Sequence, residues 1–178
     1  MTAQPDNFPS NINPLNPNGF RFDLQRVPNI TFWCQSIQLP SLILGEPAMF
    51  TPFAQVPVPG ETLQYGELSL EFLVSEDMEN YQLLYNWLVA LGLPESYDQY
   101  VNFDSADDRE LTSTLSRNYS DGTLTILNNN NQPSKQVHFV DMFPTALDAL
   151  QFDTKVQDVQ FLTARVTFRF SYYEFINV

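Results

Sequence analysis

The sequence predicts a mainly β fold, an antiparallel β-sandwich or barrel with one flanking α-helix. Aromatic residues make up 14% of the chain, and most of them stand in runs that alternate between apolar and polar side chains. Such alternation is typical of strands with one buried face. One stretch has clear helical spacing. With 178 residues and 43% hydrophobic content, the chain has enough apolar surface for one core. We therefore expect a single domain over residues 20–178.

Residues 1–19 are predicted to form an extended N-terminal arm. They contain four prolines and several asparagines but few apolar side chains, so they have little with which to build a helix or a core. The same segment lacks the basic and apolar parts of a secretory signal, and the chain has no apolar run of about 18 residues. We therefore expect a soluble protein that is not exported by the usual signal and has no membrane partner.

The first β elements are predicted to be a hairpin. Apolar Phe20, Phe22 and Leu24 alternate with polar residues, and a proline–asparagine turn at 27–29 precedes a second run over 30–38. This pattern predicts two strands joined by a tight turn.

Residues 39–60 combine two properties that rarely occur together. Five prolines exclude an internal strand, because each lacks the N–H group that a sheet ladder needs. The segment is nevertheless too apolar for a solvated loop. We predict a protruding segment that a neighbouring subunit covers. The candidate interface residues are Leu42, Ile43, Met49, Phe50, Phe53, Val56 and Val58.

A strand and a helix follow the protruding segment. Apolar side chains alternate with Glu67, Ser69 and Glu71, which predicts a strand with a polar outer face. The apolar spacing over residues 77–91 predicts the flanking helix, and Ser75 is its candidate N-cap.

The second half of the chain begins with a long polar stretch. Residues 95–120 are rich in acids and poor in branched apolar side chains, so we expect an acidic connection. The next strand runs over 123–128, and residues 128–131 form its hairpin loop. The return strand is predicted to place three residues on one face, namely Val137, Phe139 and Asp141.

A last long strand is predicted over residues 162–175. Its apolar face comprises Ala164, Val166, Phe168, Phe170 and Tyr172. This strand and the one at 67–74 are long enough to pair across subunits, and joining such edges in a ring would remove an aggregation hazard.

No group of residues predicts catalysis, and we expect neither a cofactor nor a metal. His138 has no partner histidine, and Cys34 has neither a second cysteine nor an activating base. The carboxylates of Glu67 and Glu71 are more typical of a charged wall than of a hydrolytic pair. Four clustered acids lack the spacing and glycine of a calcium loop, namely Asp104, Asp107, Asp108 and Glu110.

The net charge excludes a nucleic-acid-binding role. Lys and Arg total 8 against 21 Asp and Glu, which gives −13. Phosphate binding needs clustered cations, so this surface repels DNA.

The order of elements resembles the tail-tube family of contractile-tailed bacteriophages, over residues 20–176. Four blocks carry the resemblance. They are Phe32-Trp-Cys-Gln35 with Leu39-Pro40; the apolar loop leading to Pro59-Gly-Glu61 and the strand 67–74; the helix 78–91 with Trp87; and Phe143-Pro-Thr145 with Leu150-Gln-Phe-Asp153 and Tyr172-Tyr-Glu174.

This resemblance implies a structural protein of the virion that assembles in the host cytoplasm. Subunits of this family form hexameric rings, and their inner strands merge into a barrel around a channel for the genome. The implied partners are copies of the chain in the same and adjacent rings, the tail sheath, and baseplate or neck proteins. DNA passes without specific binding. On this interpretation Glu67, Ser69 and Glu71 are candidates for the channel face.

Three alternatives remain open. A tube-like ring at the baseplate or neck end of the tail would use the same fold. A β-sandwich binding or decoration module would be monomeric or trimeric and would not need the segment 39–60. A carboxylate-dependent hydrolase is the weakest alternative. Electron microscopy separates them, because only a ring protein forms rings or tubes.

Overall fold

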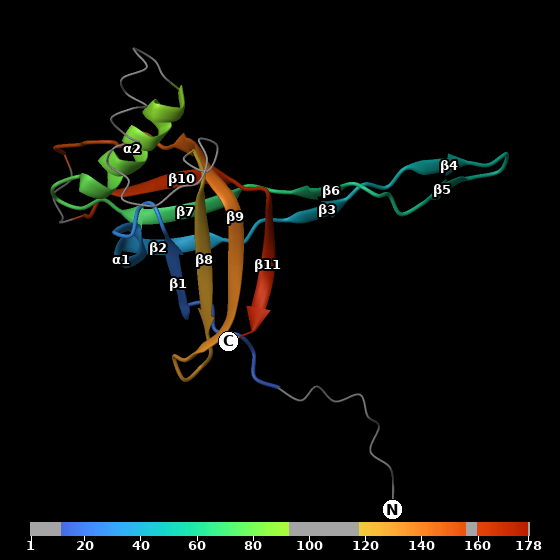
Figure 1. Ribbon diagram of the computed structural model, residues 1–178, viewed down its shortest axis with the longest axis horizontal. Coiled ribbons are helices and arrows are strands. Elements are labelled where there is room, and N and C mark those ends of the chain that lie inside the picture. Colours follow the sequence, from blue (N-terminus) through green and yellow to red (C-terminus); the bar gives the residue numbers. More distant parts are fainter. Residues whose placement is uncertain (1–11, 93–117, 156–159, 178) are drawn as a thin grey trace, which may run out of the picture.

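The computed structural model describes residues 12–92, 118–155 and 160–177 (Figure 1). The elements in chain order are β1 (Phe20–Leu24), α1 (Ile30–Trp33), β2 (Cys34–Gln38), β3 (Leu42–Leu44), β4 (Ala48–Phe50), β5 (Gln55–Pro57), β6 (Leu63–Tyr65), β7 (Leu68–Leu73), α2 (Glu79–Gly92), β8 (Ser120–Leu127), β9 (Pro133–Leu147), β10 (Thr163–Arg169) and β11 (Tyr172–Asn177). The fold is mainly antiparallel β, as the sequence predicted.

Seven strands form one bent sheet that does not close into a barrel. Its order is β1-β8-β9-β10-β7-β2, and β11 also pairs with β9. The first part of β9 pairs with β8 and β11, whereas its last residues, 143–147, pair with β10. The long strand β9 therefore belongs to two layers. Figure 1 shows β1, β8, β9 and β11 running across the direction of β2, β7 and β10.

The bend in β9 corrects one predicted face. Val137 and Phe139 are fully buried, but the next buried residue is Met142, and Asp141 is exposed. Asp141 has a φ of 55°, and the pairing with β8 shifts register at this point. A β-bulge inserts one residue and reverses the alternation of side chains, which explains why Asp141 leaves the face it was predicted to share.

The core lies between the two layers and against α2. Phe22, Phe72, Phe139 and Phe168 are all fully buried. Trp87 of α2 reaches Phe168, with ring centroids 6.2 Å apart, and its indole N–H donates to the Asn118 carbonyl oxygen at 3.3 Å.

The start of α2 differs from the prediction. The helix begins at Glu79, and the hydroxyl of Ser75 donates to Oδ1 of the buried Asn80 rather than capping the helix backbone. The same Oδ1 accepts from the backbone N–H of Tyr81, and Nδ2 of Asn80 donates to the Leu73 carbonyl oxygen at 2.7 Å. Asn80 therefore joins the end of β7 to the first turn of the helix.

The predicted opening hairpin is wrong. β1 pairs with β8 and β2 pairs with β7, so the two segments lie in different layers. Residues 30–33, predicted to be strand, form the short helix α1 instead. Ile30 is fully buried and anchors this helical turn between the layers. A turn-like sequence between two apolar runs fits a hairpin and a crossing between layers equally well.

The predicted last strand is broken into β10 and β11 between residues 169 and 172. Both halves follow the same edge of β9, as Arg169↔Phe143 and Tyr172↔Val140 show. Ala164, Val166 and Phe168 are buried as predicted, and Phe170 packs against the core. The break shifts the alternation, so Tyr173 packs inward and Tyr172, predicted to share the apolar face, is 46% exposed.

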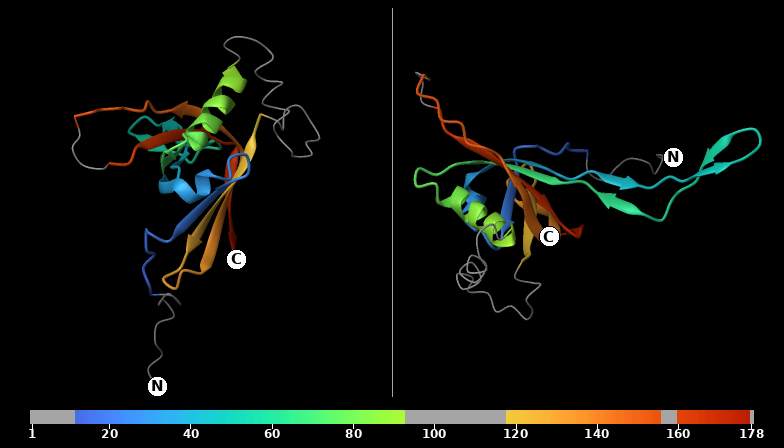
Figure 2. Two further views of the ribbon diagram at one scale, coloured as in Figure 1. Left: turned by 90° about the vertical axis from the view of Figure 1, so that its left-hand side faces the viewer. Right: turned by 90° about the horizontal axis from the view of Figure 1, so that it is seen from above.

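Residues 39–66 form a projecting hairpin that extends far from the body (Figures 1 and 2). Its two sides pair as β3 with β6 and as β4 with β5. Between these pairs, the Gly60 N–H donates to the Gly45 carbonyl oxygen at 2.7 Å, and a Cβ atom at Gly60 would overlap that oxygen. Glycine is therefore required where the two sides come closest.

Candidate assembly surfaces

The projecting hairpin presents apolar side chains that the chain itself leaves uncovered. Phe53 is 99% exposed and Phe50 is 81% exposed. The other candidate interface residues are also exposed, namely Leu42, Ile43, Met49, Val56 and Val58. All residues of β3, β4 and β5 are exposed, because a two-stranded ribbon has neither a second layer nor a helix to cover a face.

Hydrogen bonds give the tip of the projecting hairpin a fixed shape. The backbone N–H of Thr51 donates to the Ala54 carbonyl oxygen at 3.0 Å, and the Ala54 N–H donates to the Thr51 hydroxyl oxygen at 3.1 Å. These bonds close a tight turn that carries Phe53. Pro57 lies in β5, and a strand of a two-stranded ribbon has one edge free of ladder bonds, where proline is tolerated.

An aromatic cluster ties the base of the projecting hairpin to the body. The ring of Tyr65 lies 5.8 Å from that of Phe170 and 5.4 Å from that of Tyr173. Phe170 and Tyr173 in turn pack against buried Phe139. The hairpin is therefore anchored at one end, and its tip stands clear of the body.

The candidate channel face is a wall of ion pairs. Ser69 and Glu71 alternate with fully buried Leu68, Leu70 and Phe72, so they point away from the core as predicted. The neighbouring strand β10 places Arg165 opposite Glu71 and Thr167 opposite Ser69.

Both carboxylates of this wall have an arginine partner. Arg169 donates from Nε and Nη2 to Oε1 of Glu67, at 3.1 and 2.8 Å, and Nη2 of Arg165 lies 3.8 Å from Oε2 of Glu71. Two glutamates and two arginines carry no net charge together. This arrangement suits a surface wall rather than a pair of general acid and base, in which one carboxyl group must be kept protonated.

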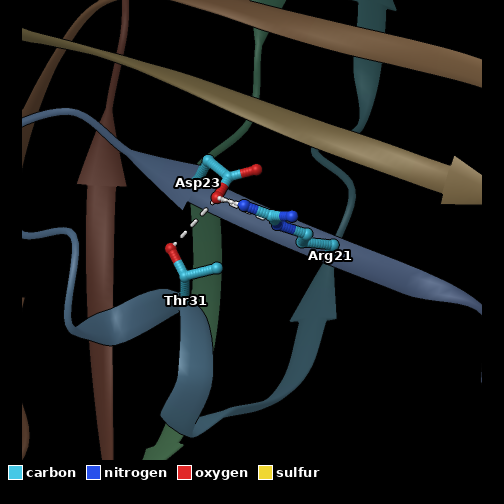
Figure 3. Close-up of polar contacts among 3 residues, drawn as sticks. All are labelled: Arg21, Asp23 and Thr31. Atoms are coloured by element: carbon cyan, nitrogen blue, oxygen red, sulfur yellow. Dashed lines mark hydrogen bonds and ion pairs between the residues drawn. The ribbon is translucent and has the colours of Figure 1, made fainter.

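A second polar cluster lies on β1 (Figure 3). Arg21 donates from Nε and Nη2 to Oδ1 of Asp23, at 3.1 and 3.0 Å, and the Thr31 hydroxyl donates to the same oxygen at 3.3 Å. An open groove of about 950 Å³ runs between β1 and α1, and Phe32 beside it is 81% exposed. This groove could not be predicted from the sequence, because residues 30–33 of α1 were predicted to be strand.

His138 and Cys34 each lie in surroundings that fit a structural role rather than catalysis. His138 stands within β9, with Nδ1 3.3 Å from the Thr123 hydroxyl oxygen. Burial raises the pKa of the Cys34 thiol to about 11, so this half-buried thiol is protonated at neutral pH. The four acids at 104–110 lie outside the described residues.

The described residues offer neither a metal site nor a membrane-spanning helix. No group of three or more His, Cys, Asp or Glu side chains is placed to hold a metal ion in the ranges 12–92, 118–155 and 160–177. Within those same ranges, neither helix has the length and apolar character needed to cross a membrane.

Comparison with known proteins adds a family and a fold. Residues 7–176 match the model of a family described as phage tail tube protein. No curated protein matches the sequence. A solved structure of the anti-feeding prophage cap, which terminates the tube, is similar with a TM-score of 0.63 and 12% identity, covering 96% of this chain and 96% of that chain.

Two further solved structures are similar over nearly the whole chain. One is from the sixfold-symmetrised baseplate of the anti-feeding prophage, with a TM-score of 0.58 and 16% identity over 93% of this chain and 97% of that chain. The other is from a sheath–tube complex of an extracellular contractile injection system in the extended state. Its TM-score is 0.57 and its identity 11%, over 93% of each chain. These similarities show a shared fold.

Proposed function

The chain belongs to the phage tail tube protein family, and on that premise we propose that it forms stacked rings of six subunits around a channel for the genome. Its role is structural, with no turnover and no cofactor, in the tail of the virion after assembly in the host cytoplasm. Its partners are other copies of the chain, the tail sheath, and baseplate or neck proteins. The sixfold symmetry of the similar baseplate structure supports six copies.

The uncovered projecting hairpin is the observation that carries this proposal. Of the twenty large hydrophobic side chains that are exposed among the described residues, ten lie between Leu39 and Leu63. Apolar surface of this extent in a monomer favours association, because its burial removes it from water. A monomeric binding or decoration module would leave this apolar surface in contact with water.

The free edges of the sheet support closure into a ring. The strands at 67–74 and 162–175 were predicted to pair across subunits. Their parts β7 and β10 are each paired on both sides within the chain, and only β11, at the end of the second strand, pairs on one side alone. Among the described strands, β1 and β11 are the two edges of the layer β1-β8-β9-β11. An even number of antiparallel strands leaves these edges running in opposite directions. A β11 edge placed beside the β1 edge of the next copy would therefore continue the antiparallel pattern.

An acidic channel is part of the proposal. Six copies multiply the net charge of −13 sixfold over the ring, and a channel lined by part of this charge repels the DNA that passes through it. The candidate channel face of Glu67, Ser69 and Glu71 contributes little to this charge, because Arg169 and Arg165 offset its carboxylates. The acidity must then come from other side chains.

Native mass spectrometry and electron microscopy of the purified protein test the proposal. We expect closed rings of six subunits that stack into tubes. A stable monomer at high concentration would contradict it, and a threefold or fivefold assembly would assign the chain to another part of the virion. A reconstruction of the tail tests the position of the ring: density along the whole shaft supports a tube subunit, and density only at the baseplate or neck supports the alternative.

A further inference from the structure

Helix α2 has two adjoining apolar faces, and the core buries only one of them completely. Leu84 and Trp87 are fully buried against the sheet. Tyr81, Tyr85 and Leu88 share the adjoining side of the helix, at spacings of four and three residues. Tyr81 is partly buried at the edge of the core, whereas Tyr85 is exposed. A helix packed on one layer normally has a polar outer face, so this second apolar side is a surplus.

The second face forms one wall of a groove. The groove has a volume of about 480 Å³ and lies between α2 and residues 145–147 of β9. Tyr85 on its wall is 54% exposed, and the Tyr81 hydroxyl donates to the Asp148 carbonyl oxygen at 3.3 Å, which fixes that ring. None of the described residues that line the groove carries a charge, although the chain has a net charge of −13.

The tip of the projecting hairpin has matching properties. Residues 47–60 contain no charged side chain. They present Phe50 and Phe53 almost fully to solvent, on a turn that Thr51 and Ala54 hold by hydrogen bonds. An aromatic anchor on a preformed turn loses little conformational entropy when it binds.

The hairpin cannot fill the groove of its own chain. Figures 1 and 2 show that it leaves the body on the side opposite α2 and points away from the helix. The hairpin tip and the α2 groove lie on opposite sides of the subunit. Contact between them would join copies head to tail, and such a contact repeats around a ring or along a stack.

We propose that the hairpin tip of one subunit docks into the α2 groove of another subunit, with Phe50 and Phe53 against Tyr81 and Tyr85. Edge-to-face packing of aromatic rings and burial of uncharged surface supply the attraction. The few aromatic residues at the centre of such a contact dominate its affinity. This inference rests on the proposed function, because both partners are copies of this chain.

Disulfide trapping tests the pairing in assembled protein. In a Cys34→Ser background, Phe53→Cys in one batch of subunits is mixed with Tyr85→Cys in another, and the assembled rings are oxidised. We expect a disulfide-linked dimer band that neither variant gives alone. Asn86→Cys is the matched control, because Asn86 is exposed on the same helix but does not line the groove. Its dimer yield should be far lower.

Labelling with a maleimide identifies the occupant of the groove. Tyr85→Cys should react quickly in the dissociated subunit and slowly in the ring. Slow reaction in both states would mean that residues of the same chain cover the groove, and this would overturn the inference. Rings that form normally while Phe53→Cys and Tyr85→Cys give no more dimer than the Asn86→Cys control would overturn it as well and leave the proposed function standing. Absence of rings in the unmodified protein would overturn both.

Discussion

The body and the projecting hairpin are both antiparallel β-structure, yet the body buries its apolar side chains and the hairpin exposes them. In β7 each apolar residue of one face is buried and the alternating residues are partly exposed. In β3, β4 and β5 every residue is exposed. The body therefore buries most of its apolar pattern within one chain, whereas the hairpin leaves its apolar side chains exposed.

On the proposed function, this difference places folding and assembly in separate segments. Contacts of the body stabilise the subunit, and the exposed hairpin tip is left to contact other subunits. Substitutions in the two regions should therefore have separable effects, and four experiments challenge that separation.

The largest effect is expected from the core. Phe168→Ala removes a fully buried ring that packs on Trp87 and should lower the free energy of unfolding by about 3–5 kcal/mol. Urea denaturation of the dissociated subunit measures the change. Assembly should fail as a consequence of unfolding. A decrease in the free energy of unfolding below about 1 kcal/mol would show that the contact between Phe168 and Trp87 is not part of the stabilising core of the body.

The hairpin should behave in the opposite way. Phe50→Ser with Phe53→Ser should leave the urea midpoint of the subunit nearly unchanged, within about 0.5 kcal/mol, because both side chains are exposed. Ring formation should be lost, since each anchor contributes about 2 kcal/mol or more per contact. Native mass spectrometry reports assembly. Phe152→Ser, also at an exposed phenylalanine, serves as the control and should assemble. Rings of normal size from the double variant would refute the interface.

A smaller effect concerns the ion-pair wall of the body. Glu67→Gln with Glu71→Gln leaves Arg169 and Arg165 without their carboxylate partners. If this face lines the channel, assembled rings should retain duplex DNA more strongly at low salt. Glu46→Gln with Glu61→Gln on the hairpin changes the net charge equally and is the control. Unchanged DNA retention in the Glu67→Gln, Glu71→Gln variant would show that this face does not line the channel.

The smallest effect concerns Cys34. Burial raises the pKa of its thiol from 9.0 to about 11, so between these values the unfolded chain releases a proton that the folded chain keeps. Stability from this residue is complete below about pH 9 and is lost as the pH rises through 11. Cys34→Ser should therefore weaken the fall of the urea midpoint between pH 8 and 10.5. An identical fall in both proteins would show that the thiol does not contribute.

Side-chain alternation predicted which residues are buried better than it predicted where strands pair. The faces of β7 and β10 are as expected, because a strand with one buried face has a period of two wherever it pairs. The failures occur where the backbone departs from regular strand. At Asp141 a left-handed residue reverses the alternation, and between β10 and β11 a break separates Phe170 from Tyr172. Neither the bulge at Asp141 nor the break between β10 and β11 contains a glycine that would have predicted it from the sequence.

Among the candidate surfaces, too, those that depend on local sequence were predictable and those formed by distant segments were not. The apolar, proline-rich composition of residues 39–60 was enough to predict a protruding segment, since proline and exposed apolar surface are local properties. The groove between α2 and β9 was not predictable from the sequence, because its two walls lie more than 50 positions apart along the chain. The arginine partners of Glu67 and Glu71 could not be predicted from the sequence either, because they depend on the register of β10 against β7.

The sequence by itself determined the β class, the flanking helix, the inward face of each regular strand and the uncovered protruding segment at residues 39–60. Each of these depends on the order of apolar and polar side chains over a few residues. The tertiary structure alone decided that β1 pairs with β8 and β2 with β7, that β9 bends through two layers, and that β1 and β11 are the edges of one layer. Strand pairing is chosen by packing between distant segments, and a local pattern is the same for every partner that offers a matching apolar face.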